Sequence, residues 1–315
     1  MPLVSIVVPC YNEKESLPIL LEALKGVVGR AQSVDASLDF EVVLVNDGSS
    51  DGTLELIKKV AHSAWPFTVR WASFSRNFGK EAALYAGLER ARGSLVAVMD
   101  ADMQDPPEML IEMLDIMRKG DCDIVAARRT SRDGEPPVRS FFARQFYKLI
   151  NRISNVKLVD GARDFRLMKR QVVDAVLQLG EYNRFSKGIF EWVGFKTHWL
   201  EYENVHRVAG KSKWNFFSLL MYSFDGIVGF STAPLLAVSA VGFVAFVLAL
   251  IFLLVIVVRA ALFGDAVAGW PSLISVILLL GGLQLLALGI MSQYLARAYM
   301  EVKRRPLFVV SESND

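Results

Sequence analysis

Residues 95–107 read LVAVMDADMQDPP, an apolar run that ends in closely spaced acidic residues and a pair of prolines. Such a run predicts a short buried strand, Leu95–Met99, and the prolines suit the first turn of a helix, Pro107–Arg118. The acidic residues would therefore stand at the carboxyl end of a strand. That is where open α/β sheets bind their ligands.

The same alternation of apolar runs and helical patterns extends outward on both sides of this stretch. The other predicted strands are Val4–Val8, Glu41–Val45, Phe67–Ala72 and Ile124–Ala127. The other predicted helices are Ser16–Val28, Thr53–His62, with Asp51 as its N-cap, and Lys80–Arg90. This pattern predicts an α/β fold whose mostly parallel sheet is covered by helices on both faces.

Polar loops follow the first two predicted strands: residues 9–13 read PCYNE, and residues 46–53 read NDGSSDGT. Because the carboxyl ends of parallel strands share one edge of a sheet, we expect these loops to meet. Acidic groups there can accept hydrogen bonds from a base N–H and from ribose hydroxyls. Each loop taken alone is equally compatible with an ordinary turn or helix cap.

Asp100 and Asp102 suggest a metal site at the same edge. Two carboxylates at i and i+2 share a strand face, and the turn after the strand can bring both near one hard cation, with Gln104 as a further oxygen ligand. A cation that also touches a diphosphate would neutralise charge on a leaving nucleotide diphosphate. A solvated surface turn is the alternative.

The C-terminal part of the chain is far more apolar than the rest. The segments Gly226–Val258 and Ala266–Ala296 contain no Asp, Glu, Lys or Arg. Each exceeds the roughly 20 residues that a helix needs to cross a bilayer. We therefore predict transmembrane helices near Leu235–Val258 and Ser272–Leu295; two buried helices of a soluble protein are the alternative.

Basic residues flank this region on one side. Lys211 and Lys213 precede the first apolar segment, and a basic cluster (Arg297, Lys303, Arg304, Arg305) follows the second. The positive-inside rule then places both termini in the cytoplasm, at the inner membrane. No secretory signal is expected, since the first apolar run is too short. The expected organisation is a catalytic domain (1–210), a juxtamembrane segment (211–233), two spans (234–296) and a cytoplasmic tail (297–315).

Overall composition excludes several other classes of protein. The chain carries 35 basic and 33 acidic residues, a net charge of +2. That balance gives no basic field for nucleic acid. The two cysteines, Cys10 and Cys122, cannot define a disulfide framework.

Five motifs occur in a fixed order along the chain: PCYNE (9–13), NDGSSDGT (46–53), SRNFGKE (75–81), DADMQDPP (100–107) and DFRLM (164–168). Together with the two apolar segments, this series resembles the family 2 glycosyltransferases that act on polyprenyl phosphates. The bactoprenol glucosyltransferases are the nearer likeness, and the dolichol-phosphate mannose synthases are the more distant one. The resemblance implies a GT-A fold, a nucleotide-sugar donor, a polyprenyl phosphate acceptor, and Mg²⁺ or Mn²⁺ as cofactor.

The resemblance also implies roles for individual residues. Asp164 stands where the family's proposed catalytic base stands, and Asp102 is favoured over Asp100 and Gln104 as the direct metal ligand. Lys80 is a candidate cation for the donor, although Glu81 could simply pair with it. The residues implied in nucleotide-sugar binding are Pro9, Tyr11, Asn12, Glu13, Asp47, Lys80, Asp100 and Ala101.

The acceptor site is argued from charge. A phosphate monoester with a second pKa of about 6 is largely dianionic at neutral pH, so it needs cations more than a base. The candidate cations are Arg128, Arg139, Lys211 and Lys213. The two lysines could instead serve only as membrane-flanking anchors. Asp164 then either removes a proton or orients the acceptor, and direct attack by phosphate predicts inversion at the anomeric carbon.

Two further stretches have the composition of membrane-surface helices, Val138–Ile153 and Lys213–Phe224. For the first, an amphipathic helix packed on the sheet is an equal alternative. Small residues on the second span (Gly281, Gly282, Ala287, Gly289) are compatible with a homo-oligomer.

The expected reaction is transfer of glucose from UDP-glucose to undecaprenyl or a related polyprenyl phosphate. GDP-mannose, UDP-N-acetylglucosamine or a UDP-aminoarabinose derivative are alternative donors. A processive polysaccharide synthase is disfavoured, since two spans are too few and no Gln-x-x-Arg-Trp motif is present. A non-catalytic nucleotide-sugar sensor or flippase scaffold is the alternative outside enzymes. Two spans also imply that a separate flippase and a downstream transferase would handle the product.

Overall fold

The computed structural model describes residues 2–130, 148, 151–153, 157–202, 231–263 and 270–314. In this part of the chain, the strands form one eight-stranded sheet in the order β7-β5-β6-β4-β1-β2-β3-β8. The strands are β1 (Leu3–Cys10), β2 (Asp39–Asn46), β3 (Thr68–Phe74), β4 (Leu95–Val98), β5 (Ile124–Arg129), β6 (Ala162–Lys169), β7 (Thr197–Tyr202) and β8 (Val310–Ser313).

The sheet is mostly parallel, as the alternating pattern predicted. β1 pairs in parallel with β2 and β4, β2 with β3, and β5 with β7. β6 runs antiparallel to both β4 and β5, and β8 runs antiparallel to β3. The carboxyl ends of β1 to β4 therefore share one edge with the amino end of β6.

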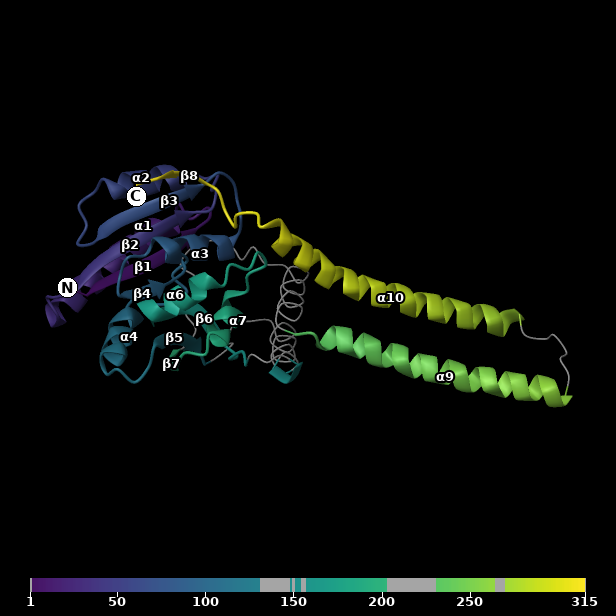
Figure 1. Cartoon of the computed structure of the whole chain (residues 1–315). Coiled ribbons are helices and arrows are strands. Elements are labelled where there is room, and N and C mark those ends of the chain that lie inside the picture. The colour runs from purple at the N-terminus through teal and green to yellow at the C-terminus, as the bar shows by residue number, and fades with distance from the viewer. Residues whose placement is uncertain are drawn as a thin grey trace.

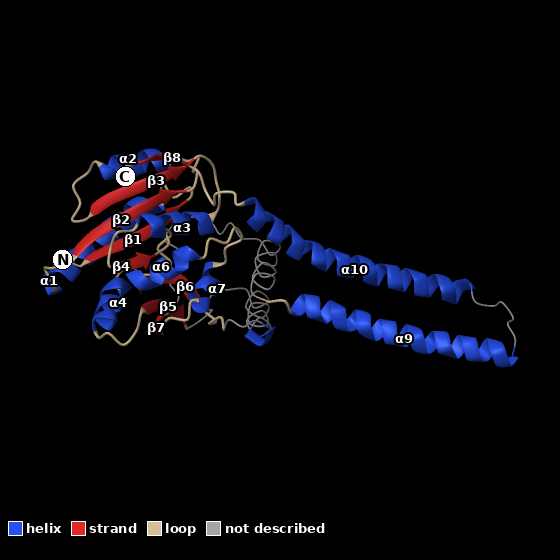
Figure 2. Ribbon diagram, in the orientation of Figure 1, coloured by secondary structure: helices blue, strands red, loops and turns tan. Residues whose placement is uncertain are grey.

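Helices cover both faces of the sheet (Figures 1 and 2). One apolar layer includes residues of α1 (Ser16–Val34), α2 (Thr53–Ala61) and α4 (Met109–Arg118). The other includes residues of α3 (Lys80–Arg90), α6 (Arg170–Gln178) and α7 (Ser186–Trp192). Along β1, Val4, Ile6 and Val8 face the first layer and Val7 the second, as the pleat of a strand requires.

Several elements differ from the expectations. α1 continues to Val34, six residues beyond the predicted end, because buried Ala31 extends its apolar face. α2 has Gly52 as its N-cap, while the predicted cap, Asp51, accepts the backbone N–H of Thr53 at 3.1 Å. The polar C-terminal residues expected as a tail instead supply β8, which pairs with the edge strand β3.

Two long helices follow, α9 (Ala233–Phe263) and α10 (Trp270–Lys303), and they extend together away from the sheet (Figure 1). Among the described residues, one helical stretch, Leu279–Lys303, is long and apolar enough to cross a membrane. Its most apolar part is not buried against the rest of the protein. Ala233–Ala245 is a shorter apolar helical stretch. The first predicted span, near Leu235–Val258, therefore stays a prediction.

Some expectations fall outside the described residues. These are the acceptor cations Arg139, Lys211 and Lys213, the stretch Lys213–Phe224, and most of Val138–Ile153.

Candidate active site

The loops after β1 and β2 meet, as expected from the parallel sheet. The N–H of Asn12 donates to Ser49 Oγ at 3.0 Å, and the side-chain oxygen of Asn12 accepts the N–H of Ser50 at 2.9 Å. The N–H of Glu13 donates to Thr53 Oγ1 at 3.0 Å. Asn12 has a positive φ of 56°, which asparagine tolerates better than most residues. Tyr11 precedes Asn12 in the same loop, and 38% of its surface is exposed.

Asp47 links this joint to the loop after β3, residues 75–79, hereafter the donor loop. Its buried carboxylate accepts the N–H groups of Phe78 at 2.6 Å and Gly79 at 2.9 Å. Burial raises the pKa of Asp47, an effect that these two hydrogen bonds oppose. In this structure Asp47 positions the donor loop, and its contact with a nucleoside stays a prediction.

The antiparallel strand β6 brings Asp164 to the acidic pair after β4. Val98, the last residue of β4, pairs with Arg166 of the antiparallel strand β6. Asp100 follows Val98 by two residues and Asp164 precedes Arg166 by two, so both carboxylates lie at the same end of this strand pair. β6 was absent from the sequence-based elements, and no spacing in the sequence relates these two residues.

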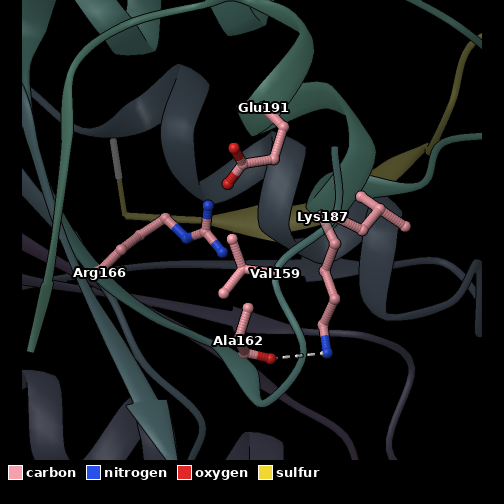
Figure 3. A pocket seen from close by; sticks show the side chains of 6 residues that line it. Val159, Ala162, Arg166, Lys187 and Glu191 are labelled. Atoms are coloured by element: carbon pink, nitrogen blue, oxygen red, sulfur yellow. Dashed lines mark hydrogen bonds between the residues drawn. The ribbon is translucent and has the colours of Figure 1, made fainter. Parts of the chain in front are cut away.

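Arg166 is a buried cation close to Asp164. It is 2% exposed, its guanidinium lies 3.8 Å from the ring centroid of Phe190, and it donates to the carbonyls of Arg163 and Asp164. Burial lowers its pKa to about 10. Arg166 lines a small cavity with Val159, Ala162, Lys187 and Glu191 (Figure 3). A buried cation at this place favours the ionised form of the nearby Asp164 carboxylate.

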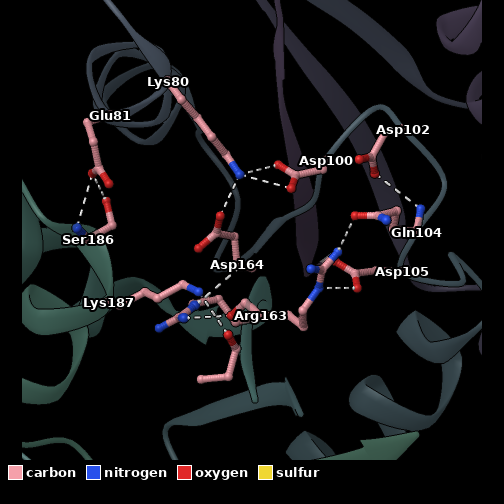
Figure 4. A network of polar contacts seen from close by, with 12 residues as sticks. Lys80, Glu81, Asp100, Asp102, Gln104, Asp105, Arg163, Asp164, Ser186 and Lys187 are labelled. Atoms are coloured by element: carbon pink, nitrogen blue, oxygen red, sulfur yellow. Dashed lines mark hydrogen bonds and ion pairs between the residues drawn. The ribbon is translucent and has the colours of Figure 1, made fainter. Parts of the chain in front are cut away.

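Lys80 lies between two of the predicted site residues (Figure 4). Its Nζ is 2.7 Å from Asp100 Oδ1 and 2.5 Å from Asp164 Oδ2. Burial would lower the pKa of Lys80, but the two carboxylates raise it above its ordinary value. Glu81, the alternative partner, instead accepts hydrogen bonds from the N–H and Oγ of Ser186. In this structure the close ion pairs of Lys80 are therefore with Asp100 and Asp164.

Nearby cations also set the pKa of Asp164. Burial would raise its pKa, but Lys80 and then Lys187 hold it well below the usual range. Lys187 itself donates to the carbonyl of Ala162 at 3.0 Å, and burial lowers its pKa. Sequence reasoning missed Lys187, since nothing in its local sequence signals a site; the α7 helix places it there. Asp164 is thus an ionised carboxylate among cations.

A second network surrounds the rest of the acidic motif. Arg163 donates to Asp105 Oδ1 at 2.8 Å and to Gln104 Oε1 at 3.1 Å, and the hydroxyl of Tyr202 also donates to Asp105. Asp102 Oδ1 accepts the N–H of Gln104 at 3.1 Å. The side-chain oxygen of Gln104, expected as a metal ligand, therefore faces Arg163 in this structure.

The donor set fits a hard divalent cation that is shared with a substrate. Asp100 and Asp102 offer carboxylate oxygens at the strand end, the ligand type that Mg²⁺ and Mn²⁺ favour. No group of three or more His, Cys, Asp or Glu side chains that could hold a metal occurs among the described residues. The remaining ligands would have to come from a diphosphate and water, as is usual for Mg²⁺ sites with one or two carboxylates.

Of the predicted acceptor cations, Arg128 is described. It lies at the end of β5, where Nε donates to the carbonyl of Asp160 at 3.1 Å and the guanidinium pairs with Glu201 at 3.3 Å. Two predicted donor residues remain. Pro9 is half-buried near the end of β1, and Ala101 is buried in the turn that follows β4.

Comparison with known proteins agrees with a sugar-transferring class of enzyme. The glycosyl transferase family 2 model matches residues 5–177. Over 99% of this chain and 92% of the relative, the sequence is 42% identical to a putative glycosyltransferase, CsbB, of Bacillus subtilis. It is 39% identical to a prophage bactoprenol glucosyl transferase homolog of Escherichia coli, over 98% of each chain.

Among solved structures, glucosyl-3-phosphoglycerate synthase of Mycobacterium tuberculosis gives a TM-score of 0.45 at 16% identity, over 72% of this chain and 78% of that one. The chain belongs to glycosyl transferase family 2, and it is a glycosyltransferase with a GT-A-like, mostly parallel α/β sheet.

Proposed function

We propose that this enzyme transfers a hexose, glucose from UDP-glucose, to a polyprenyl phosphate such as undecaprenyl phosphate. The observation that carries the proposal is the cluster at the carboxyl edge of the sheet, in which Lys80 joins Asp100 to Asp164. Relatives that match nearly the whole chain are named bactoprenol glucosyl transferases, which favours a lipid acceptor and glucose. GDP-mannose, UDP-N-acetylglucosamine and a UDP-aminoarabinose derivative are the alternative donors.

The donor would lie over the joined loops after β1 and β2. Tyr11, Asn12 and Glu13 follow β1 at this edge, and we propose that Pro9 and Ala101 also line the donor site. A divalent cation held by Asp100 and Asp102 would offset the charge of the donor's diphosphate. Lys80 supplies a protein cation at the same place.

The acceptor would approach Asp164 from the side of α7. A dianionic phosphate oxygen attacks the anomeric carbon, the bond from that carbon to the UDP oxygen breaks, and UDP leaves with the electron pair. Because the nucleophile is already charged, Asp164, itself ionised, would orient the acceptor or its cations and need not remove a proton. Lys187 is a cation within this group, and we add it to Arg128, Arg139, Lys211 and Lys213 as a candidate for the acceptor phosphate.

The lipid acceptor requires a membrane location. We propose that α9 and α10 are both spans of the inner membrane, with the catalytic sheet and both termini on the cytoplasmic side. The lack of charged residues in Gly226–Val258 and Ala266–Ala296 supports this topology. The product would then need a flippase and a downstream transferase for use in cell-envelope glycans, and the small residues of the second span would suit a homo-oligomer.

The proposal is tested with the detergent-purified full chain, radiolabelled UDP-glucose and undecaprenyl phosphate. We expect label in the organic phase, its loss with EDTA, its restoration by Mg²⁺ or Mn²⁺, and its loss in Asp102→Asn and Asp164→Asn. An α-linked donor should give a β-linked product, and a retained anomer would contradict direct attack by phosphate.

The remaining donors are then tried in the same assay. Transfer from one of them would correct the sugar and keep the reaction class. If no donor labels lipid while the protein stays folded and binds UDP, the sensor or scaffold function would replace this proposal.

A further inference from the structure

The chain returns to the sheet after α10, through residues 306–314, hereafter the C-terminal segment. β8 pairs antiparallel with the edge strand β3, with Ala72 opposite Ser313 and Ser73 opposite Glu312. The side chain of Asn314 accepts the N–H of Trp71 at 2.7 Å and donates to the carbonyl of Val69 at 3.0 Å. Polar groups along an otherwise open sheet edge are thus satisfied.

These contacts continue past the end of β3 into the donor loop. The N–H of Ser75, the first residue of the loop, donates to the carbonyl of Val309 at 2.9 Å. Phe308 stacks on Phe74 with 4.8 Å between ring centroids, and Phe74 meets Phe78 edge-on at 5.7 Å. An aromatic row therefore runs from the C-terminal segment into the donor loop.

The donor loop is held at both ends. Val309 holds Ser75, and Asp47 holds the N–H groups of Phe78 and Gly79. The next residue is Lys80, whose ammonium lies between Asp100 and Asp164. A shift of Ser75 or Phe78 would move the start of α3, and with it the Lys80 side chain.

We infer that the C-terminal segment is a positioning segment of the donor site: through Phe308 and Val309 it sets the position of the donor loop and of Lys80. The same segment continues directly from α10, so non-covalent contacts of Phe308 and Val309 link the donor loop to the chain that leaves this long helix. This inference rests on the proposed function for its kinetic consequence, and on the fold alone for its structural consequence.

The strand offers a matched control. Glu312 pairs with Lys58 at 2.6 Å, with both side chains well exposed, on the part of β8 away from the donor loop. Exposed ion pairs contribute little to stability. Glu312→Gln therefore perturbs the same strand without touching the aromatic row.

The experiment compares Phe308→Ala and Glu312→Gln in the full chain, in detergent. Hydrogen exchange of residues 75–80, followed by mass spectrometry, should be at least about tenfold faster in Phe308→Ala and unchanged in Glu312→Gln, because lost packing lowers local protection. The value of kcat/KM for the nucleotide sugar should fall about tenfold in Phe308→Ala. Thermal unfolding should stay cooperative.

Unchanged exchange at residues 75–80 in Phe308→Ala would overturn the inference. If Phe308→Ala also loses protection across β1 and β2, Phe308→Leu is measured next, since leucine keeps apolar volume without the ring. In Phe308→Leu, faster exchange confined to residues 75–80 supports the inference, and wild-type exchange overturns it. If the wild type transfers no sugar, the proposed function fails, and the exchange comparison still decides the positioning role.

Discussion

Lys80 is the residue on which the site's electrostatics depend. Its ammonium contacts Asp100 and Asp164, which the sequence separates by 64 residues (164 − 100). Carboxylates brought this close repel each other unless a cation lies between them. Lys80 therefore bridges these two carboxylates, whether or not it also serves the donor as we propose.

Replacing Lys80 by methionine keeps much of the side-chain length and removes the charge. We expect transfer activity to fall about 10²-fold or more, the usual cost of losing one preorganised charge in a site. Lys25→Met removes an exposed lysine that pairs with Glu22 on α1, and it should retain full activity. Equal activity in both variants would contradict the role of Lys80.

The same variant should change the pH profile. In the wild type, Lys80 and Lys187 depress the pKa of Asp164, so Asp164 stays ionised through the neutral range. Without Lys80, burial is less opposed, the pKa rises, and activity should decline as the pH falls through this higher value. Residual activity of Lys80→Met, measured from pH 5 to 9, should show an acid limb at higher pH than the wild type.

At the scale of elements, the donor loop depends on a close approach between two loops. Gly48 has a φ of +64°, and a Cβ there would lie 2.4 Å from the carbonyl carbon of Arg76. The loop after β2 therefore packs directly on the donor loop's backbone. This backbone contact and the hydrogen bonds of the Asp47 carboxylate together join the ends of β2 and β3 at the site.

Gly48→Ala should destabilise the fold by about 2 kcal/mol or more, since it adds a backbone clash to an unfavourable φ. Gly26→Ala is the matched substitution, because Gly26 lies on the exposed face of α1 with open space around it. That change should stabilise the protein by about 0.5–1 kcal/mol through helix propensity. Chemical denaturation of both variants measures the difference; a wild-type midpoint for Gly48→Ala would show that the loops can separate at little cost.

At the scale of the whole molecule, the question is how α9 and α10 relate to the bilayer. The catalytic sheet and the paired long helices form two ends of one elongated molecule (Figure 1). If both helices span the membrane, position 265 between them is on the non-cytoplasmic side, and the sheet is on the cytoplasmic side.

Cysteine labelling in intact cells tests this topology. Asp265→Cys should react with a membrane-impermeant maleimide in intact cells. Ser63→Cys, at an exposed position two residues after α2, should react only after lysis. The native thiols of Cys10 and Cys122 are buried, and burial raises the pKa of both, so they give a low background. Labelling of Ser63→Cys before lysis would show the opposite orientation. Protection of Asp265→Cys in intact cells would argue against two spans.

Local patterns in the sequence predicted much of this protein. Short apolar runs and helical apolar patterns predicted β1 to β5 and α1 to α4, because the residues that such a strand or helix buries are set by its own local sequence. The parallel sheet then implied that the loops holding Asn12 and Ser49 meet, and they do. The family series also singled out Asp100, Asp102 and Asp164.

The partners of those residues were decided by the tertiary structure alone. Asp164 lies near Asp100 because β6 runs antiparallel beside β4. Lys187 is brought to the site by α7, and the C-terminal segment adds β8 to the edge strand β3. Lys80 and Asp164 are 84 residues apart, and Trp71 and Asn314 are 243 apart. No local periodicity records such pairings, because strand direction and register between distant segments follow from packing of the whole chain and not from the residues next to each strand.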